Sequence, residues 1–180
     1  MNDYRDIDML RTTELYVARK GWFKPVYILT DGQFNYGSIT SPGVFTRIKN
    51  IETAETKFSI KPKGFFGKAV DIIDRNKSEV IGHYRKNGWE TRITLEMNNG
   101  LNAILKKGKG IFSRKMIWTD EQYGDYLEIK HCGRLTKPFK IKIEPNSIKS
   151  IKSKLPLTLL TLIGVNFMLI KEAQAASAGV

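Results

Sequence analysis

Cysteine and histidine are scarce in this sequence, and their scarcity limits the chemistry that the chain can perform. Cys132 is its single cysteine, and His83 and His131 are its two histidines. One cysteine can form neither an intramolecular disulfide nor a cysteine-based metal site, which suits a reducing compartment. Two histidines without a cluster of carboxylates do not make a metal site. We therefore expect no metal and no cofactor.

Motifs for catalysis, nucleotide binding and secretion are also lacking. No glycine-rich phosphate loop of the dinucleotide or Walker type precedes a helix. His131 and Cys132 are neighbours on an expected strand, where successive side chains point to opposite faces, so they do not form a dyad. A pairing of Cys132 with His83 stays open. The first residues contain no apolar run of a secretory signal. We predict that the chain is cytoplasmic and is not an enzyme.

Acidic residues are few in comparison with basic ones. The chain holds 30 Lys and Arg against 18 Asp and Glu, a formal net charge of +12. The excess is concentrated in residues 106–154. A surface of this sign attracts lipid headgroups, nucleic acid or acidic proteins. The charge alone does not choose among them.

What the sequence does contain, from about residue 13 to residue 144, is a succession of β-strand patterns. In "KPFKIKIE", Phe139, Ile141 and Ile143 alternate with polar residues, and in "TKFSIK" Phe58 and Ile60 do the same. We count about twelve such strands, with turn signals roughly every 8–12 residues, a spacing typical of sandwiches and barrels. No linker divides the chain, so we predict a single domain over residues 1–180.

Turn sequences between these strands predict hairpins. Asp31-Gly32 and Asn87-Gly88 are type I′ signals, and "NNGL" at residues 98–101 is a further turn. "YILTDGQFNYGSIT" and "VDIIDRNKSEVIGHYR" share one plan, in which an Asp-containing turn joins two hydrophobic strands. An antiparallel arrangement follows from these short connections.

One long hydrophobic run, "LPLTLLTLIGVNFMLI", breaks the strand pattern at Leu155–Ile170. Ser153 is a suitable N-cap and Pro156 suits a first helical turn, so we expect a helix over about residues 154–172 and a flexible tail at 173–180. A helix without a polar face is either buried or membrane-spanning. These 16 residues cover about 24 Å, against a bilayer core of roughly 30 Å. Burial is therefore favoured over the alternative, a tail anchor flanked by lysines.

The strands and the helix together predict the fold. A closed barrel of about twelve strands has an interior wider than its own side chains can fill. The apolar helix is the one segment that could fill it. We therefore predict a mainly β protein, a twelve-stranded antiparallel closed barrel that encloses a C-terminal hydrophobic α-helix.

This layout resembles the tubby C-terminal domain superfamily, which includes the phospholipid scramblases and the LURP-one-related proteins. The resemblance rests on the order of elements, on the two hairpins quoted above, and on "LPLTLLTLIGVNFMLI" as the last element. It implies binding to phospholipid or phosphoinositide headgroups. Cysteine clusters are absent and "WTDEQYGD" is too sparse for a calcium loop, so calcium-driven scrambling is not expected. No headgroup-binding residue of the family is carried over to this chain.

Lysines late in the chain are the candidate binding residues. We expect "KKGKG" to be a hairpin loop, Lys140 and Lys142 to face outward from one strand, and the remaining lysines to lead into the helix. If these segments meet at one end of the barrel, they form an anion-binding patch. Its candidate members are Lys106, Lys107, Lys109, Lys140, Lys142, Lys149, Lys152 and Lys154.

Nucleic acid is the alternative anionic partner, and it would require exposed aromatic residues among the basic ones. Strand alternation places most of the aromatics in the core, out of a set made up of Trp22, Trp89, Trp118, Phe65, Phe66 and Phe112. "KGFFGK" is the exception, because Phe65 and Phe66 lie between lysines on an expected loop. They could stack on bases, enter a membrane interface or fold back onto the barrel rim. Our leading prediction is peripheral binding to anionic lipids at the inner face of the membrane. Protein partners and oligomeric state are left open.

Overall fold

The computed structural model describes residues 3–7, 10, 12–43, 46–64, 68–86, 92–110, 114–120, 124–144 and 157–178. It contains twelve strands followed by one long helix. The strands are β1 (Glu14–Lys20), β2 (Val26–Thr30), β3 (Asn35–Thr40), β4 (Lys49–Thr53), β5 (Lys57–Lys63), β6 (Ala69–Asp74), β7 (Glu79–Lys86), β8 (Ile93–Met97), β9 (Asn102–Lys107), β10 (Lys115–Asp120), β11 (Gly124–His131) and β12 (Phe139–Ile143), and the helix is α2 (Leu157–Ala178).

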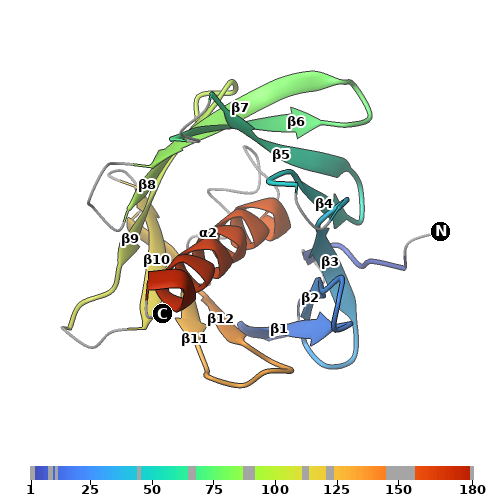
Figure 1. The fold of residues 1–180 in the computed structure, drawn as a ribbon, viewed down its shortest axis with the longest axis vertical. Coiled ribbons are helices and arrows are strands. Elements are labelled where there is room, and N and C mark those ends of the chain that lie inside the picture. Colours follow the sequence, from blue (N-terminus) through green and yellow to red (C-terminus); the bar gives the residue numbers. More distant parts are fainter. Residues whose placement is uncertain are drawn as a thin grey trace.

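The strands form one closed antiparallel barrel around the helix (Figure 1). Each strand pairs with the next in the chain, and β12 pairs with β1 to close the sheet, with Leu15 opposite Ile141. Closure removes the two exposed sheet edges that an open sheet would have. The predicted fold class, a twelve-stranded barrel enclosing an apolar helix, is confirmed.

Alternation of apolar and polar residues explains why each strand takes its place in the barrel. On β12, Phe139, Ile141 and Ile143 are buried, whereas Lys140 and Lys142 point outward. On β5, Phe58 and Ile60 are buried in the same way. A one-residue slip would turn either set to solvent, so burial fixes the register.

Two hairpins are held by aspartate side chains in their turns. Asp31 Oδ1 accepts hydrogen bonds from the backbone N–H groups of Gln33 (2.8 Å) and Phe34 (2.7 Å). Asp74 Oδ1 accepts from those of Asn76 (2.8 Å) and Lys77 (3.2 Å). The shared plan of the two hairpins is therefore confirmed.

The β2–β3 turn differs from the predicted type I′ geometry. Gly32 has a positive φ of 99°, but Asp31 does not, and a type I′ turn needs positive φ at both positions. Thr30 pairs with Asn35, so the loop is wider than two residues. The physical reason is the Asp31 carboxylate, which captures two backbone N–H groups and also accepts a 2.6 Å hydrogen bond from the Tyr36 hydroxyl. The second predicted type I′ turn, Asn87-Gly88, lies outside the described residues.

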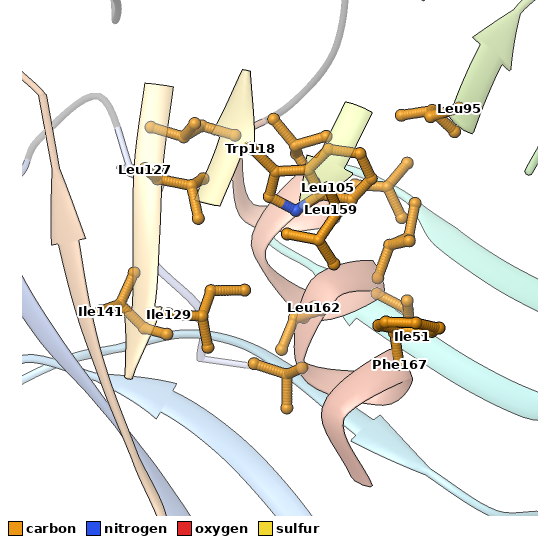
Figure 2. Close-up of a cluster of buried hydrophobic side chains, with 14 of the residues drawn as sticks. Ile51, Leu95, Leu105, Trp118, Leu127, Ile129, Ile141, Leu159, Leu162 and Phe167 are labelled. Carbon is orange, nitrogen blue, oxygen red and sulfur yellow. The ribbon is translucent and has the colours of Figure 1, made fainter. Parts of the chain in front are cut away.

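The helix fills the barrel. Residues 157–168 are all buried, and Figure 2 shows Leu159 and Leu162 of α2 among Trp118, Leu127 and Ile129 from β10 and β11. Fully burying a Leu or Ile side chain contributes about 1.5–3 kcal/mol, so this segment contributes a large part of the core. Within this segment, the Thr161 hydroxyl donates a hydrogen bond to the Leu157 carbonyl (2.8 Å).

Small residues let the helix and strands approach closely at two points. A Cβ added at Gly164 of α2 would lie 2.4 Å from Ile129 Cδ1 and 2.7 Å from Trp118 Nε1. A Cβ added at Gly37 of β3 would lie 2.7 Å from Thr158 Cγ2. Real Cβ atoms almost never approach this closely, so glycine is required for the observed packing.

The helix continues beyond its expected end near residue 172, as far as Ala178. Residues 173–178 are therefore helical, and the predicted tail does not begin at residue 173. The reason is composition, because "EAQAASA" is rich in alanine, the strongest helix former. The predicted N-cap Ser153 and first-turn Pro156 lie outside the described residues.

By length and composition, α2 could also cross a membrane, and it is the one described helix that could. The tail-anchor alternative needs its apolar side chains to face lipid. In this structure the side chains of residues 157–168 face the protein's own strands instead.

Candidate functional site

Antiparallel topology sorts the loops into two sets, one at each end of the barrel. The β1–β2, β3–β4, β5–β6, β7–β8, β9–β10 and β11–β12 connections all lie at one end. The C-terminal part of α2 lies at this same end, because Glu172 Oε1 is 3.0 Å from Nε2 of His131, the last residue of β11. The remaining connections and the start of α2 lie at the opposite end.

Charge differs between these two ends. Every charged residue in the described loops at the end just defined is Lys or Arg, and we call this end the basic end. Its loop residues are Lys24, Arg47, Lys68, Arg92, Lys109, Arg114, Arg134 and Lys137, and the adjoining strand termini add Lys20, Lys49, Lys63, Lys86, Lys107 and Lys115. The excess positive charge of the described chain is thus gathered on one face rather than spread around the barrel.

The opposite end is mainly acidic, and we call it the acidic end. Its described loops and strand termini carry Glu14, Asp31, Glu55, Asp74, Glu79, Asp120 and Glu144, against Lys57, Arg75 and Lys77. A molecule with this separation of charge is oriented by the field of an anionic surface, basic end first.

The structure brings together only part of the predicted lysine patch. Lys106 and Lys107 end strand β9, rather than lying in a loop as expected, and Lys109 follows in the β9–β10 loop. All three are exposed at the basic end.

The two lysines of β12 do not belong to that cluster. Lys140 and Lys142 point outward from the barrel wall and form ion pairs, with Glu14 (2.8 Å) and Glu144 (3.3 Å). The hydrogen bond to Glu14 raises the pKa of Lys140. Lys142 lies beside the acidic end. The predicted members Lys149, Lys152 and Lys154 lie outside the described residues.

Exposed hydrophobic side chains stand among the basic loops. Trp22 and Phe23 in the β1–β2 loop are 77% and 89% exposed, and Leu135 in the β11–β12 loop is 75% exposed. We call these three residues the hydrophobic tips. Their loops are adjacent, because the Arg19 N–H donates to the Thr136 carbonyl (2.9 Å).

The position of Trp22 corrects one expectation. Sequence alternation suggested a core position for most of the aromatics, and Trp118 is indeed fully buried. Trp22 follows the end of β1 and so escapes the alternation of that strand. Basic neighbours flank the tips in sequence, namely Lys20, Lys24, Arg134 and Lys137. Phe65 and Phe66, the aromatic pair of the expected "KGFFGK" loop, lie outside the described residues.

A pocket of about 440 Å³ opens beside α2 at the basic end, and we call it the Tyr84 pocket. One stripe of the helix lines it, with Asn166, Ile170 and Gln174 spaced four residues apart. The facing wall carries Tyr84 and Lys86 from β7, Lys49 from β4 and Arg47 from the preceding loop.

Buried polar groups form the inner part of the Tyr84 pocket. The Asn166 Nδ2 group donates a 3.2 Å hydrogen bond to the Tyr84 hydroxyl. Burial raises the pKa of Tyr84 and keeps it neutral. Burial lowers the pKa of Lys49 and of Lys86, and the Arg47 charge lowers that of Lys86 further. A bound anion would therefore stabilise the charged form of both ammonium groups.

A second pocket, of about 380 Å³, lies on another stripe of the helix, which presents Met168, Lys171 and Glu172. Its opposite wall carries Lys107 and His131. Burial raises the pKa of Glu172, although the charge of His131 opposes this. Burial, together with Lys107, lowers the pKa of Lys171. This pocket contains its own acidic partner, so it is the less suited of the two to an anion.

In the part of the chain that the structure describes, groups for covalent or metal chemistry do not converge. Cys132 is exposed at the basic end, whereas His83 lies on β7 and pairs with Glu96 (2.9 Å). Four strand-to-strand steps separate β7 from β11, so the open Cys132–His83 pairing does not form. Among the described residues, no three His, Cys, Asp or Glu could hold a metal ion together. The basic groups of this end are arranged in a way that suits the binding of anions.

Comparisons of the chain with protein-family models, with curated proteins and with solved structures find no match. The resemblance to the tubby-like superfamily therefore stays a prediction. The charges, hydrophobic tips and pockets of the basic end are the features that point to a function.

Proposed function

We propose that this chain is a non-enzymatic module that binds reversibly to anionic phospholipid surfaces through its basic end. One observation carries the proposal: the hydrophobic tips and the basic loops occupy the same end of the barrel. Aromatic rings at the headgroup level and cations facing anionic lipids are the two usual elements of peripheral membrane binding. The site of action would then be the anionic inner leaflet of the membrane.

The charges supply the electrostatic part of this binding. Each basic residue near an anionic leaflet contributes about 1 kcal/mol, and the attraction falls off within a Debye length. The basic end has many such residues, so binding is expected to weaken steeply with salt. Few of them are arginines, whose guanidinium groups bind phosphate through two parallel hydrogen bonds. We therefore expect a preference for anionic lipids in general over one phosphoinositide.

The tips supply the apolar part. Fully burying a side chain of this size contributes about 1.5–3 kcal/mol. Replacing Trp22 and Phe23 together with serine should therefore weaken vesicle binding by roughly tenfold or more. Val80, which is 45% exposed at the acidic end, offers a matched control. Val80→Ser should leave binding unchanged.

Sedimentation with vesicles of graded anionic content tests the proposal. Binding should rise with the anionic fraction, fall with salt, and drop roughly thirtyfold in a Lys24→Ala, Arg134→Ala variant, at about 1 kcal/mol for each lost cation. Lys57→Ala, Lys77→Ala at the acidic end is the control. Equal binding to neutral and anionic vesicles would exclude the proposal. Binding to single-stranded nucleic acid with no vesicle binding would instead favour the alternative anionic partner, since exposed aromatics among cations also stack on bases.

A further inference from the structure

The Tyr84 pocket has features that a flat membrane surface does not require. It is a cavity of about 440 Å³ beside the helix, within the range that small-molecule sites occupy. Ile60, Val70 and Ile170 form its apolar walls, and polar side chains line both its outer and its inner part.

Cations stand on the outer part of the pocket. Arg47, Lys49 and Lys86 all line it, and none of the described lining residues is acidic. The Lys49 ammonium donates a short hydrogen bond to the Ser41 hydroxyl, which fixes its position. Burial penalises the charges of both lysines, so an anion seated between them would relieve that cost. A group with a charge near −2, such as a phosphate monoester, suits three cations better than a single carboxylate does.

An acceptor without a partner stands on the inner part. Asn166 is 1% exposed, and its Oδ1 atom accepts no hydrogen bond from the described residues, although its Nδ2 donates to Tyr84. A buried polar atom left without a hydrogen bond costs free energy, and native structures usually provide it with a partner. Since Asn166 lines the pocket, a bound molecule with a hydroxyl group can donate that hydrogen bond.

We infer that the Tyr84 pocket binds a phosphorylated polyol, with the phosphate held by Arg47, Lys49 and Lys86 and a hydroxyl donating to Asn166 Oδ1. The glycerophosphoryl group is the smallest example of this chemistry. It occurs free, as glycerophosphate, a monoester with a charge near −2, and as the headgroup of phosphatidylglycerol, a diester with a single negative charge. For the lipid source, the inference rests on the proposed membrane function; for the free source, it does not.

Isothermal titration calorimetry on the full chain tests the pocket with two matched probes. Ethyl phosphate carries the same charge as glycerophosphate but no hydroxyl group. Wild type should bind glycerophosphate about tenfold more tightly than ethyl phosphate, the effect of one satisfied buried hydrogen bond. Asn166→Leu keeps the branched shape of the side chain but removes both amide groups, and it should abolish this preference. Equal affinity of the wild type for the two probes, or no binding of either, overturns the inference.

A second variant keeps the test decisive if Asn166→Leu does not fold. Lys86→Met removes one phosphate-binding cation and should weaken both probes by about tenfold or more. Lys109→Met, an exposed lysine at the same end but outside the pocket, is the control and should leave both affinities unchanged. Equal losses in the two lysine variants would show that only general electrostatics acts, and would overturn the inference.

Vesicles of phosphatidylglycerol then distinguish the two sources of the ligand. If soluble glycerophosphate releases the protein from these vesicles, the lipid headgroup occupies the pocket. If glycerophosphate binds without releasing it, the ligand is a free metabolite, and the pocket assignment holds in either case. The Trp22→Ser, Phe23→Ser variant should lose vesicle binding while its calorimetry stays unchanged. Failure on vesicles alone therefore rejects the membrane proposal, and failure in calorimetry alone rejects the pocket.

Discussion

Replacing Gly164 with alanine sets two known effects against each other. Alanine is about 1 kcal/mol better than glycine inside a helix, so propensity alone predicts a more stable protein. In this structure, however, the new methyl group would lie 2.4 Å from Ile129 Cδ1 and 2.7 Å from Trp118 Nε1. Ile129 and Trp118 are both fully buried, so neither can move aside into solvent.

The packing effect should be the larger of the two. Forcing an extra methyl group into a filled core costs about 1–3 kcal/mol. After subtraction of the propensity gain, Gly164→Ala should lower the free energy of unfolding by about 1 kcal/mol, or about 2–4 °C in Tm for a chain of this size. Urea and thermal unfolding followed by circular dichroism measure both quantities.

A glycine in open surroundings provides the control for this substitution. Among the described residues, a Cβ at Gly43 would meet the Thr46 Cγ2 atom alone, at an ordinary 3.7 Å. Gly43→Ala should therefore be neutral or stabilising, by up to about 1 kcal/mol, because it restricts the unfolded chain. If Gly164→Ala is instead more stable than wild type, propensity acts unopposed. The helix is then not seated against Trp118 and Ile129, and the architecture described above is incorrect.

Three further predictions concern stability. Burial raises the pKa of Asp31, but hydrogen bonds from Tyr36 and from backbone N–H groups outweigh burial, so the folded pKa lies below the ordinary 3.8. The Asp31 carboxylate therefore stabilises the fold above pH 3.8, and this stabilisation is lost as the pH falls through the lower folded pKa. Asp31→Ala should thus cost about 1 kcal/mol at pH 7, and the unfolding curves of variant and wild type should converge in acid; a cost unchanged at low pH would contradict this. For Lys86 the folded pKa lies below the ordinary 10.5, so its ammonium opposes folding at neutral pH and the penalty disappears as the pH rises through this range. Lys86→Met should therefore unfold at the same or a higher urea concentration at pH 7, and a lower midpoint would show that the ammonium has a stabilising partner. Deleting residues 157–178 should leave an unfolded or insoluble chain in expression trials, whereas a folded, soluble remainder would restore the tail-anchor alternative.

The fold could be predicted because each of its elements has a local signature. Alternation at Phe139, Ile141 and Ile143 identifies a strand with one buried face, and an uncharged run such as Leu155–Ile170 identifies a helix with no face for water. The interior of a twelve-stranded barrel is too wide for its own side chains to fill, so the apolar helix is expected inside it. The helix end was misplaced because alanine-rich segments continue a helix without any need for packing.

The candidate site could be predicted only in part, because it depends on which end of the barrel each loop occupies. Lys106, Lys107 and Lys109 lie together at the basic end, whereas Lys140 and Lys142, which were expected in the same patch, form ion pairs with carboxylates on the barrel wall. Successive loops alternate between the two ends, so charges that are close in sequence are separated in space, and distant ones are gathered. Counting basic residues in every second turn would have identified the basic end.

The Tyr84 pocket had no signal in the sequence. Tyr84 and Asn166 are 82 positions apart, and each reads locally as an ordinary core residue. The passage of α2 beside β7 brings the two together and leaves the Asn166 Oδ1 atom without a hydrogen-bond donor among the described residues.

The order of elements along the chain has a consequence for biosynthesis. The ribosome makes all twelve strands before α2, so the lining of the barrel emerges before the segment that fills it. Until that segment leaves the exit tunnel, the apolar side chains that line the nascent sheet are not covered by the helix. Exposed apolar surface of this kind aggregates and is bound by chaperones. The barrel is therefore expected to complete its folding only after α2 has left the exit tunnel.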